Sequence, residues 1–308
     1  MEKMLIIGAS GLTGFKLAQL AVNEYHVFGT YNHRTVNLNQ CELFQLDKSD
    51  TEKTNILIKR LEPDVVIDCS ALHNVDYCET HKDQSLIINT ESTKNIANIC
   101  KEINAKMIFL STDYVYDGTA NSYTEESPTN PLNYYGLCKL NAEEEIINTG
   151  ISYAIGRTSL VFGWNASELR GIKSSSGKTM NFVIWTLNKL RNHEALKIVT
   201  DQYSTPTFAD NLAEYMLALA KSNKNGIFHT VGSECINRYD FTIKIAEIFE
   251  LDPDLVSPVN SDSFKQIAKR PMRCCLNSSK AQKILNVKAL NIKQALTKMK
   301  NQEQHYQF

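Results

Sequence analysis

The sequence predicts an α/β protein built on a doubly wound parallel sheet, and two patterns carry this prediction. Short, nearly continuous apolar runs alternate with amphipathic helical segments through the first two-thirds of the 308 residues. Strands that are buried on both faces have this continuous apolar character, and helices between them indicate βαβ units. Because crossovers between parallel strands are right-handed, the helices should cover both faces of the sheet. A ligand is then expected beyond the carboxyl ends of the strands.

The elements of this sheet follow in order along the chain. We expect strands at Met4–Ile7, Val27–Thr30, Leu43–Leu46, Val65–Asp68 and Met107–Leu110. We expect the intervening helices at Leu12–Asn23, in a segment ending near Pro63, and at Asp83–Asn104. Leu12–Asn23 and Asp83–Asn104 both have apolar residues at helical spacing, which predicts one buried face on each helix.

Beyond Arg157 the pattern is less regular. Helical spacing occurs at Phe182–Arg191, Phe208–Lys221, Tyr239–Leu251 and Ser278–Leu285, and a late strand is expected at Ile227–Val231. The segment Trp164–Lys178 is polar and rich in Ser and Gly, which is typical of a mobile loop near a site. The last residues, Asn301–Phe308, are expected to be frayed.

Composition narrows the class of partner. Hydrophobic residues make up 43% of the chain and charged residues 22%, as in ordinary soluble globular proteins. The net charge of −1 gives no electrostatic argument for nucleic acid or an anionic membrane. The apolar run within Met1–Ala9 is too short for a signal peptide, and no window approaches the ~20 apolar residues of a membrane span. We expect a cytoplasmic protein with a small-molecule partner and neither a nucleic-acid nor a membrane partner, and a homodimer is left open.

The eight cysteines are scattered through strand-like and helix-like segments, apart from the adjacent Cys274 and Cys275. That pair lacks a partner Cys-x-x-Cys or His spacing, so the sequence predicts no metal site. We expect reduced, mostly buried thiols.

A glycine motif, Gly8-x-x-Gly11-x-x-Gly14, lies directly between the first strand and the first helix. Glycine permits the tight turn and lets the backbone approach a pyrophosphate, which the helix N-terminus then holds. The alternative is a purely structural turn, but the position of the motif at the first βαβ unit favours dinucleotide binding. The motif and the sheet together indicate a Rossmann fold.

This interpretation divides the chain into two parts. Residues 1–160 are assigned to the Rossmann domain, and 200–232 are expected to return to it. Residues 161–199 and 233–308 are assigned to a smaller, mostly C-terminal substrate-binding subdomain.

The end of the second strand bears on the choice between NAD and NADP. An acidic residue there commonly binds the adenosine ribose of NAD, whereas this chain reads Thr30-Tyr31-Asn32-His33-Arg34. Arg34 is able to pair with a 2′-phosphate through charge-assisted hydrogen bonds. The alternative is a solvated surface Arg, so NADP(H) is preferred and NAD(H) stays open. Asp47, which follows the next strand, is a candidate partner for the adenine amino group.

A catalytic set follows from two further segments. Thr112 lies where a buried strand ends, and Tyr135 and Lys139 are four residues apart and share one face of a helix. Reduction of a ketone needs a proton for the developing alkoxide, and lowering the pKa of a phenol from about 10 to about 7 takes roughly 4 kcal/mol. The Lys139 ammonium, one helical turn away, would supply part of this free energy. The Thr112 hydroxyl would bind the carbonyl oxygen. The alternative is a chance Tyr–Lys pair on a solvated helix face. The combination with the glycine motif favours the catalytic interpretation.

Together these segments resemble the dTDP-4-dehydrorhamnose reductase family of extended short-chain dehydrogenases/reductases. The resemblance rests on the glycine motif, on Ser-Thr-Asp-Tyr-Val-Tyr-Asp-Gly at 111–118, and on Tyr135-x-x-x-Lys139. It extends along nearly the whole chain, in order, through Asn89, Arg157-Thr158-Ser159, Asn181-Phe182, Asp201–Thr207, Gly226–His229 and Arg270-Pro271.

The resemblance implies reduction of the C4 ketone of a dTDP-linked 6-deoxy-hexulose, the last step to dTDP-L-rhamnose. It implies that Tyr135 is the proton donor, Lys139 its electrostatic partner and a cofactor ligand, and Thr112 the carbonyl-binding hydroxyl. With the motifs above, the predicted cofactor contacts are Gly8, Ser10, Gly11, Leu12, Gly14, Asn32, His33, Arg34, Asp47, Ser70, Ala71, Leu72, Tyr135 and Lys139. The predicted substrate contacts are His73, Val75, Thr112, Leu160, Phe182 and Arg270. A helix core position is the alternative for Phe182, and a surface cation is the alternative for Arg270.

Two departures from the family pattern affect the sugar pocket. Leu160 stands where bacterial members usually have a Trp that packs on the sugar, and Trp164 is a candidate substitute. The segment from Trp164 to Met180 also looks longer than in compact members. A non-catalytic relative, the regulatory beta subunit of methionine adenosyltransferase, has similar departures and is the main alternative. A reductase or epimerase acting on another nucleotide sugar is the second.

Overall fold

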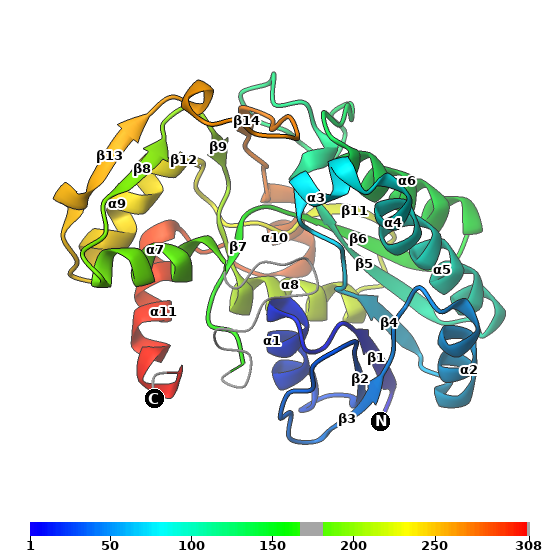
Figure 1. Cartoon of the computed structure of the whole chain (residues 1–308). Coiled ribbons are helices and arrows are strands. Elements are labelled where there is room, and N and C mark those ends of the chain that lie inside the picture. Colours follow the sequence, from blue (N-terminus) through cyan, green and yellow to red (C-terminus); the bar gives the residue numbers. More distant parts are fainter. Residues whose placement is uncertain (167–180, 307–308) are drawn as a thin grey trace.

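The core of the molecule is a sheet of seven parallel strands, seen in the centre and right of Figure 1. Its order is β11-β6-β5-β4-β1-β2-β3, and every neighbouring pair is parallel. The strands are β1 (Lys3–Ile7), β2 (His26–Tyr31), β3 (Cys41–Gln45), β4 (Val65–Asp68), β5 (Lys106–Thr112), β6 (Tyr153–Thr158) and β11 (Gly226–His229). The computed structural model describes residues 1–166 and 181–306.

Helices cover both faces of this sheet. On one face, α1 (Leu12–Ala21) and α8 (Ala209–Lys221) pack on β1, β4 and β5 through residues such as Leu17, Tyr215 and Met216. On the other face lie α2 (Thr51–Leu61), α5 (Ser92–Glu102) and α6 (Tyr134–Thr149). The prediction of a doubly wound parallel sheet is therefore confirmed.

The predicted helix at Asp83–Asn104 is three segments in the structure. A short α4 (Lys82–Leu86) leads into a π-helical turn (Ile87–Glu91) and then into α5, and α3 (Val75–Thr80) precedes them. The π-helical turn contains Asn89, which is completely buried. Its amide group binds both backbone polar groups of Leu72, with Leu72 N donating to Oδ1 at 2.9 Å and Nδ2 donating to Leu72 O at 3.1 Å. The turn thereby fixes the loop that follows β4.

The remaining elements form a second cluster beside the sheet, at the left and top of Figure 1. Its strands are β7 (Val161–Phe162), β8 (Leu196–Val199), β9 (Tyr203–Ser204), β10 (Thr207–Phe208), β12 (Ile236–Asn237), β13 (Val256–Val259) and β14 (Arg273–Cys274). Its helices are α7 (Phe182–Arg191), α9 (Arg238–Ile248) and α11 (Ile292–Tyr306), while α10 (Ser279–Leu285) packs beside α8 and β11. The strands pair in sheets of two or three, namely β10-β7, β12-β9-β14 and β13-β8. The domain boundaries assigned from the sequence stay a prediction.

The expectation that the C-terminus is frayed from Asn301 is wrong for residues 301–306, because α11 continues to Tyr306. Ile292, Ala295, Leu296 and Met299 form its buried face and pack in a core with Phe162, Phe208 and Phe241. The predicted mobile loop at Trp164–Lys178 lies, from residue 167 on, outside the described residues.

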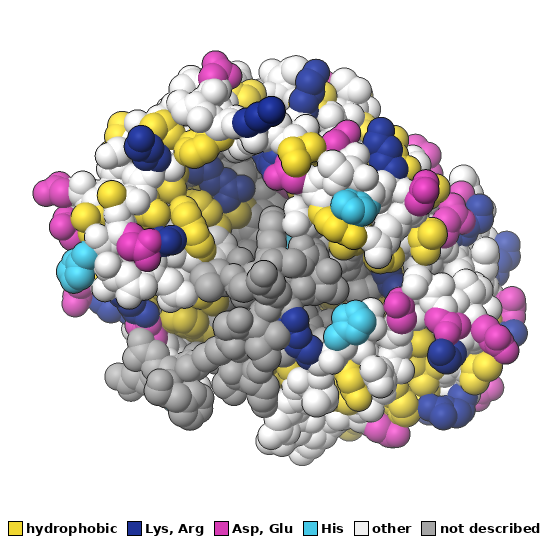
Figure 2. All heavy atoms as spheres, viewed as in Figure 1, with side chains coloured by type: hydrophobic (Ala, Val, Ile, Leu, Met, Phe, Trp, Pro, Cys, Tyr) yellow, Lys and Arg dark blue, Asp and Glu magenta, His cyan; other side chains and the backbone are white. Residues whose placement is uncertain are grey.

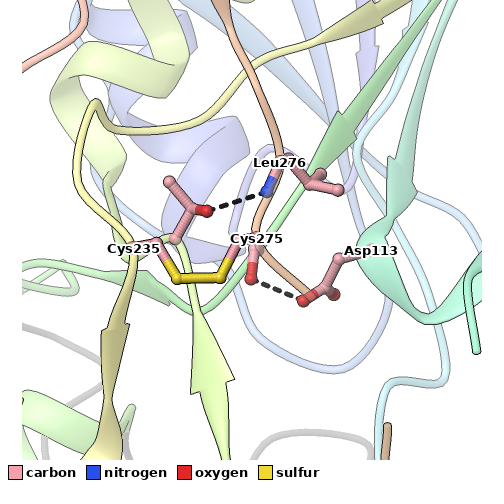
Figure 3. Close-up of a disulfide and its surroundings, with 6 residues drawn as sticks. Asp113, Cys235, Cys275 and Leu276 are labelled. Atoms are coloured by element: carbon pink, nitrogen blue, oxygen red, sulfur yellow. Dashed lines mark hydrogen bonds between the residues drawn. A yellow bond between two sulfur atoms is a disulfide. The ribbon is translucent and has the colours of Figure 1, made fainter. Parts of the chain in front are cut away.

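The expectation that all cysteines are reduced is also wrong. Cys235 precedes β12 and Cys275 follows β14, and the two are joined by a disulfide (Figure 3). Both strands flank β9, so their ends lie side by side with a Cα–Cα separation of 5.4 Å, within the range that a disulfide spans. The free cysteines among the described residues are Cys41, Cys69, Cys78, Cys100, Cys138 and Cys274.

The surface carries both signs of charge. On the face shown in Figure 2, Lys and Arg side chains are interspersed with Asp and Glu, and neither sign forms a continuous field. Among the described helices, none combines the length and apolar character needed to cross a membrane.

Candidate active site

The glycine motif forms the turn between β1 and α1, and this turn has no room for side chains. Gly8 has φ of +84°, and a Cβ there would lie 2.9 Å from the Cβ of Ser70. A Cβ on Gly14 would lie 2.3 Å from the carbonyl oxygen of Gly8. Gly11 caps α1 without a side-chain hydrogen bond, so no side chain blocks the first N–H groups of the helix. This open helix N-terminus suits the pyrophosphate of a dinucleotide.

The predicted adenosine contacts follow β2 and β3. Asn32 and Arg34 are half-buried and His33 is exposed, and Arg34 forms no ion pair with the described residues. Asp47 is exposed, and its Oδ1 accepts hydrogen bonds from the backbone N–H and the hydroxyl of Ser49 at 2.9 and 2.7 Å. This end of β2 carries a cation and no acid, as an NADP site requires.

The loop after β4 faces the glycine turn. Ser70 contacts the position of Gly8, Ala71 is half-buried, and Leu72 is buried and held by Asn89. Ser10 lies within the turn itself and Leu12 begins α1, and both are half-buried. The predicted pyrophosphate and nicotinamide contacts therefore lie at one edge of the sheet, where β1, β4 and β5 end.

Thr112 is the last residue of β5, and it is 7% exposed. Its hydroxyl donates to Oδ1 of Asp113 at 3.1 Å and accepts from the N–H of Tyr114 at 3.2 Å. The other carboxylate oxygen of Asp113 accepts from Ser159 at 2.5 Å (Figure 3). Burial raises the pKa of Asp113 to about 6 against these hydrogen bonds. Asp113 was not among the predicted site residues, although it adjoins Thr112 in the sequence.

Tyr135 is brought to Thr112 by the start of α6. A Cβ on Gly136 would lie 2.1 Å from the carbonyl oxygen of Tyr114, so only glycine lets the helix approach the turn after β5 this closely. The Tyr135 side chain is half-buried, hydrogen-bonds Thr112, and meets the Tyr114 ring edge-on at 6.3 Å. Burial, and then the negative charges that Cys78 and Asp113 would carry, raise the pKa of Tyr135, and the Thr112 hydrogen bond acts in the opposite direction.

Lys139, one turn further along α6, is 1% exposed. Its Nζ donates to the carbonyl oxygen of Leu110 at 2.8 Å and lies 3.7 Å from the centre of the Phe109 ring. Burial lowers its pKa to about 7, and the positive charge of Lys48 acts in the same direction, whereas Asp68 and Glu143 oppose it. Thr112, Tyr135 and Lys139 therefore meet where β5 ends and α6 begins.

The predicted substrate contacts lie on the side of the second cluster. Val75 is buried at the start of α3 and His73 is exposed in the loop before it. Arg270 forms a bidentate ion pair with Asp76 of α3, at 2.8 and 2.7 Å, and also hydrogen-bonds Tyr114. This ion pair joins the loop before β14 to the helix beside the site, so Arg270 is more than a solvated surface cation.

Phe182, the first residue of α7, is half-buried among aromatic rings. It contacts Arg238, which is not among the predicted site residues. The guanidinium of Arg238 lies 5.0 Å from the centre of the Phe182 ring, at the start of α9. The charge of Arg238 acts on Asp113 and Tyr114, which links the second cluster to the turn after β5. Arg238 directly precedes the helix predicted at Tyr239–Leu251, and no local pattern in the sequence marks it as a site residue.

Leu160 and Trp164 differ in backbone conformation and in burial. Leu160 is half-buried and has φ of +42°, a left-handed conformation that is uncommon for Leu and stands out beside a site. Trp164 is 9% exposed and its Nε1 donates to the carbonyl oxygen of Met299 at 2.8 Å. The interpretation of Trp164 as a platform for the sugar is therefore wrong, since its ring packs in the core beneath α11.

The order of motifs along this edge has a counterpart in a known family. A family model described as RmlD substrate binding domain matches residues 1–305. The chain belongs to this family. The predicted resemblance to dTDP-4-dehydrorhamnose reductases is confirmed, since a relative of that name from Aggregatibacter actinomycetemcomitans is 28% identical over 96% of this chain and 97% of its own length.

Other proteins that are similar to this chain have different names. Methionine adenosyltransferase 2 subunit beta from Bos taurus is 29% identical over 91% of this chain and 81% of its own length. A hypothetical dTDP-4-dehydrorhamnose reductase from Sulfolobus tokodaii is 33% identical, with a TM-score of 0.81 over 95% of this chain and 98% of that chain. A dTDP-4-dehydrorhamnose reductase from Bacillus anthracis in complex with NADP has a TM-score of 0.84 over 98% of this chain and 99% of that chain; its 24% identity shows the fold alone.

Proposed function

We propose that this protein is an NADP(H)-dependent reductase of a nucleotide-linked 4-keto-6-deoxy-hexulose. The substrate we favour is dTDP-4-dehydro-L-rhamnose, which would be reduced to dTDP-L-rhamnose. The observation that carries the proposal is the close approach of α6 to the end of β5. Because of this approach, the Tyr135 side chain lies beside Thr112, and Lys139 is buried one helical turn further along α6.

The residues at the sheet edge fit NADP(H), which would supply the hydride. The tight turn at Gly8 and Gly14 leads into the N-terminus of α1, which Gly11 caps without a side chain and which suits the pyrophosphate, and the cation at Arg34 suits a 2′-phosphate. Lys139 uses one of its three donors on Leu110, which leaves two for the ribose hydroxyls of the nicotinamide half.

The proton would come from Tyr135. Burial raises its pKa in the ligand-free protein, so the phenol holds its proton at neutral pH, and lowering that pKa for proton transfer would depend on Lys139 and the bound cofactor. Lys139 would stabilise the phenolate that remains after transfer, and Thr112 would direct its hydroxyl at the ketone oxygen. To do so, the Thr112 hydroxyl has to turn from Asp113.

On the substrate side, Phe182, Arg238 and Arg270 supply an aromatic ring and two cations. Nucleoside diphosphates carry negative charge, and guanidinium groups bind phosphate oxygens in a bidentate fashion. The proposal therefore directs the diphosphate toward Arg238 and Arg270, and the sugar ring toward Thr112 and Tyr135.

The test is NADPH oxidation, followed at its absorbance band, with dTDP-4-keto-6-deoxy-L-hexulose and with its UDP and GDP counterparts. We expect turnover with at least one of these, fastest with the dTDP sugar. Faster turnover with a UDP or GDP sugar would replace the nucleotide and keep the reaction. Absence of oxidation with all three would contradict the reductase proposal. Retention of the hydride within each turnover would instead identify an epimerase.

A second candidate is a regulatory role like that of the methionine adenosyltransferase subunit. Two observations favour it: Leu160 stands where the resemblance to bacterial reductases implies a sugar-packing Trp, and the chain is similar to that subunit. Under this alternative the chain binds NADP without turnover and co-purifies with a methionine adenosyltransferase. A pull-down with that enzyme, carried out in parallel with the assay, distinguishes the two roles.

A further inference from the structure

A buried ion pair lies beneath the cofactor side of the site, and no predicted site residue belongs to it. Lys48 follows β3 and Asp68 ends β4, and their side chains are 5% and 0% exposed. Lys48 Nζ lies 2.8 Å from Oδ2 of Asp68. Charges this deeply buried are costly unless they are paired and hydrogen-bonded.

The pair is fixed by hydrogen bonds from several elements. Oδ1 of Asp68 accepts from the backbone N–H and the hydroxyl of Ser70, at 3.0 and 2.7 Å. Oδ2 accepts from Thr93 of α5 at 3.3 Å in addition to Lys48. Lys48 also donates to the carbonyl oxygen of Ser70 at 3.0 Å. The ion pair therefore holds Ser70, the residue against which Gly8 packs.

The same pair adjoins Lys139. Asp68 and Phe109 are register partners on β4 and β5, and the Lys139 ammonium lies over the Phe109 ring. Lys139 thus projects from α6 into the layer between helices and sheet that contains Asp68 and Thr93. Among the described residues its hydrogen-bond partner is Leu110, so the surrounding charges act on an ammonium with further donors to use.

Charged and titratable groups lie near Lys139 on two sides, and Tyr135 lies one turn before it on α6. From the sheet side these are Lys48, Asp68 and Cys69, and from α6 they are Glu143 and Cys138. Glu143 forms a bidentate ion pair with Arg157, and burial raises the pKa of both thiols, so they stay uncharged. Lys48 and Asp68 act on Lys139 in opposite directions, and Glu143 acts in the same direction as Asp68.

The geometry points to a positioning role for Lys48 and Asp68, which as a buried ion pair orient the Lys139 ammonium and set its charge state beneath the cofactor site. The importance of that charge state for turnover rests on the proposed reductase function. The effect of Lys48 and Asp68 on Lys139 itself does not depend on that function.

The test separates the two charges. In Lys48→Met a positive neighbour is lost, so the pKa of Lys139 should rise by about one pH unit; in Asp68→Asn a negative neighbour is lost, so it should fall by a similar amount. The double variant should lie between the two, because it removes both charges together. The measurement is an NMR pH titration of lysine-labelled apo protein, with the Lys139 signal assigned by its loss in Lys139→Arg.

The double variant also guards against misfolding, because replacing both members of a buried pair is tolerated better than leaving one charge alone. Lys94→Met is the matched control, since Lys94 pairs with Glu145 of α6 at the surface at 3.0 Å, and it should leave the Lys139 titration unchanged. Equal or same-direction shifts in the two single variants, or none, would overturn the inference.

The pH profile gives the second readout. The alkaline limb of kcat/KM should move up in Lys48→Met and down in Asp68→Asn, because activity requires the Lys139 ammonium. If no keto-sugar is turned over, the reductase proposal fails while the NMR titration still decides the inference. If turnover is normal and the titration does not respond, the inference fails alone.

Discussion

At the scale of the residue, Tyr135 and Lys139 are neighbours on one helix with different surroundings. Tyr135 is half-buried beside Thr112 and faces the site, whereas Lys139 is 1% exposed and reaches the backbone of β5. Burial disfavours the charged form of both, so it raises the pKa of the phenol and lowers that of the amine. A bound cofactor and substrate would have to stabilise the opposite forms during the reaction.

Tyr135→Phe should lower kcat for keto-sugar reduction by about a hundredfold or more, because the substitution removes the phenolic hydroxyl that would donate the proton and leaves the ring. NADPH affinity, measured by fluorescence titration, should stay within a few-fold of the wild type. Tyr134→Phe is the control, since Tyr134 lies next in sequence and its ring instead faces Lys82. Turnover at the wild-type rate in Tyr135→Phe would remove Tyr135 from the mechanism.

Arg34→Ala should weaken NADPH binding by roughly tenfold to a hundredfold and NADH binding far less, because charge-assisted contacts to a 2′-phosphate would be lost. Dissociation constants for both cofactors measure this directly. Arg60→Ala, which removes a cation over the Phe44 ring on the α2 side, should change neither. Equal losses for the two cofactors would show that Arg34 does not bind the 2′-phosphate.

His229 of β11 makes stability depend on pH. It is completely buried, and burial lowers its pKa to about 3, so it stays neutral in the folded protein while the unfolded chain takes up a proton below about pH 6.5. Stability should therefore fall as the pH drops from 6.5 toward 3, with about 2 kcal/mol lost by pH 5 from this group. Urea unfolding at pH 7.5 and 5 should show a smaller loss in His229→Gln than in the wild type. The exposed His26→Gln is expected to behave like the wild type.

At the scale of the element, the start of α6 determines whether the catalytic set exists. Gly136→Ala adds a methyl group 2.1 Å from a backbone oxygen, so the helix must move away from the turn after β5. We expect a stability loss of about 1–3 kcal/mol and roughly a hundredfold loss of kcat/KM. Leu137→Ala, one residue further and 40% exposed, should leave both near wild type. An active, stable Gly136→Ala protein would contradict the role given to this contact.

The elements that the sequence predicted are those with a local signal. The strands of the main sheet are continuous apolar runs, and α7 was placed at Phe182–Arg191 by its periodicity, with the bounds that the structure has. The two-residue strands β9, β12 and β14 have no pattern of their own, because pairing between distant segments defines them. For α11 a signal was present, since Ile292, Ala295, Leu296 and Met299 follow helical spacing, but it was not used.

Within the site, the same distinction applies. The glycine motif and the Tyr–Lys spacing are local and could be read directly. Lys48 and Asp68 are twenty residues apart, and the Cys235–Cys275 disulfide joins residues separated by 40. Contacts of this kind arise when strands and loops pack, so neither could be predicted from spacing. The conformation of Leu160 likewise depends on its surroundings, since its carbonyl accepts from Thr207 at 3.2 Å.

At the scale of the whole molecule, one face of the main sheet is covered by a segment from late in the chain. Residues of α8, including Leu212, Tyr215 and Met216, pack on α1 and on the strands near the centre of the sheet. A fragment of residues 1–160 should therefore expose this apolar face, aggregate, and lack a cooperative thermal transition. The full-length chain, prepared in parallel, provides the reference. A soluble fragment with cooperative unfolding would show that α8 is dispensable for the sheet.

The late position of α8 also affects how the chain is made. During translation, residues 3–158 can supply six of the seven parallel strands well before the helix that covers one of their faces leaves the ribosome. The nascent protein thus passes through a stage in which a hydrophobic surface awaits a segment still being synthesised. Slow synthesis between residues 158 and 221 would prolong that stage, so the rate at which these codons are read should influence the yield of native protein in the cell.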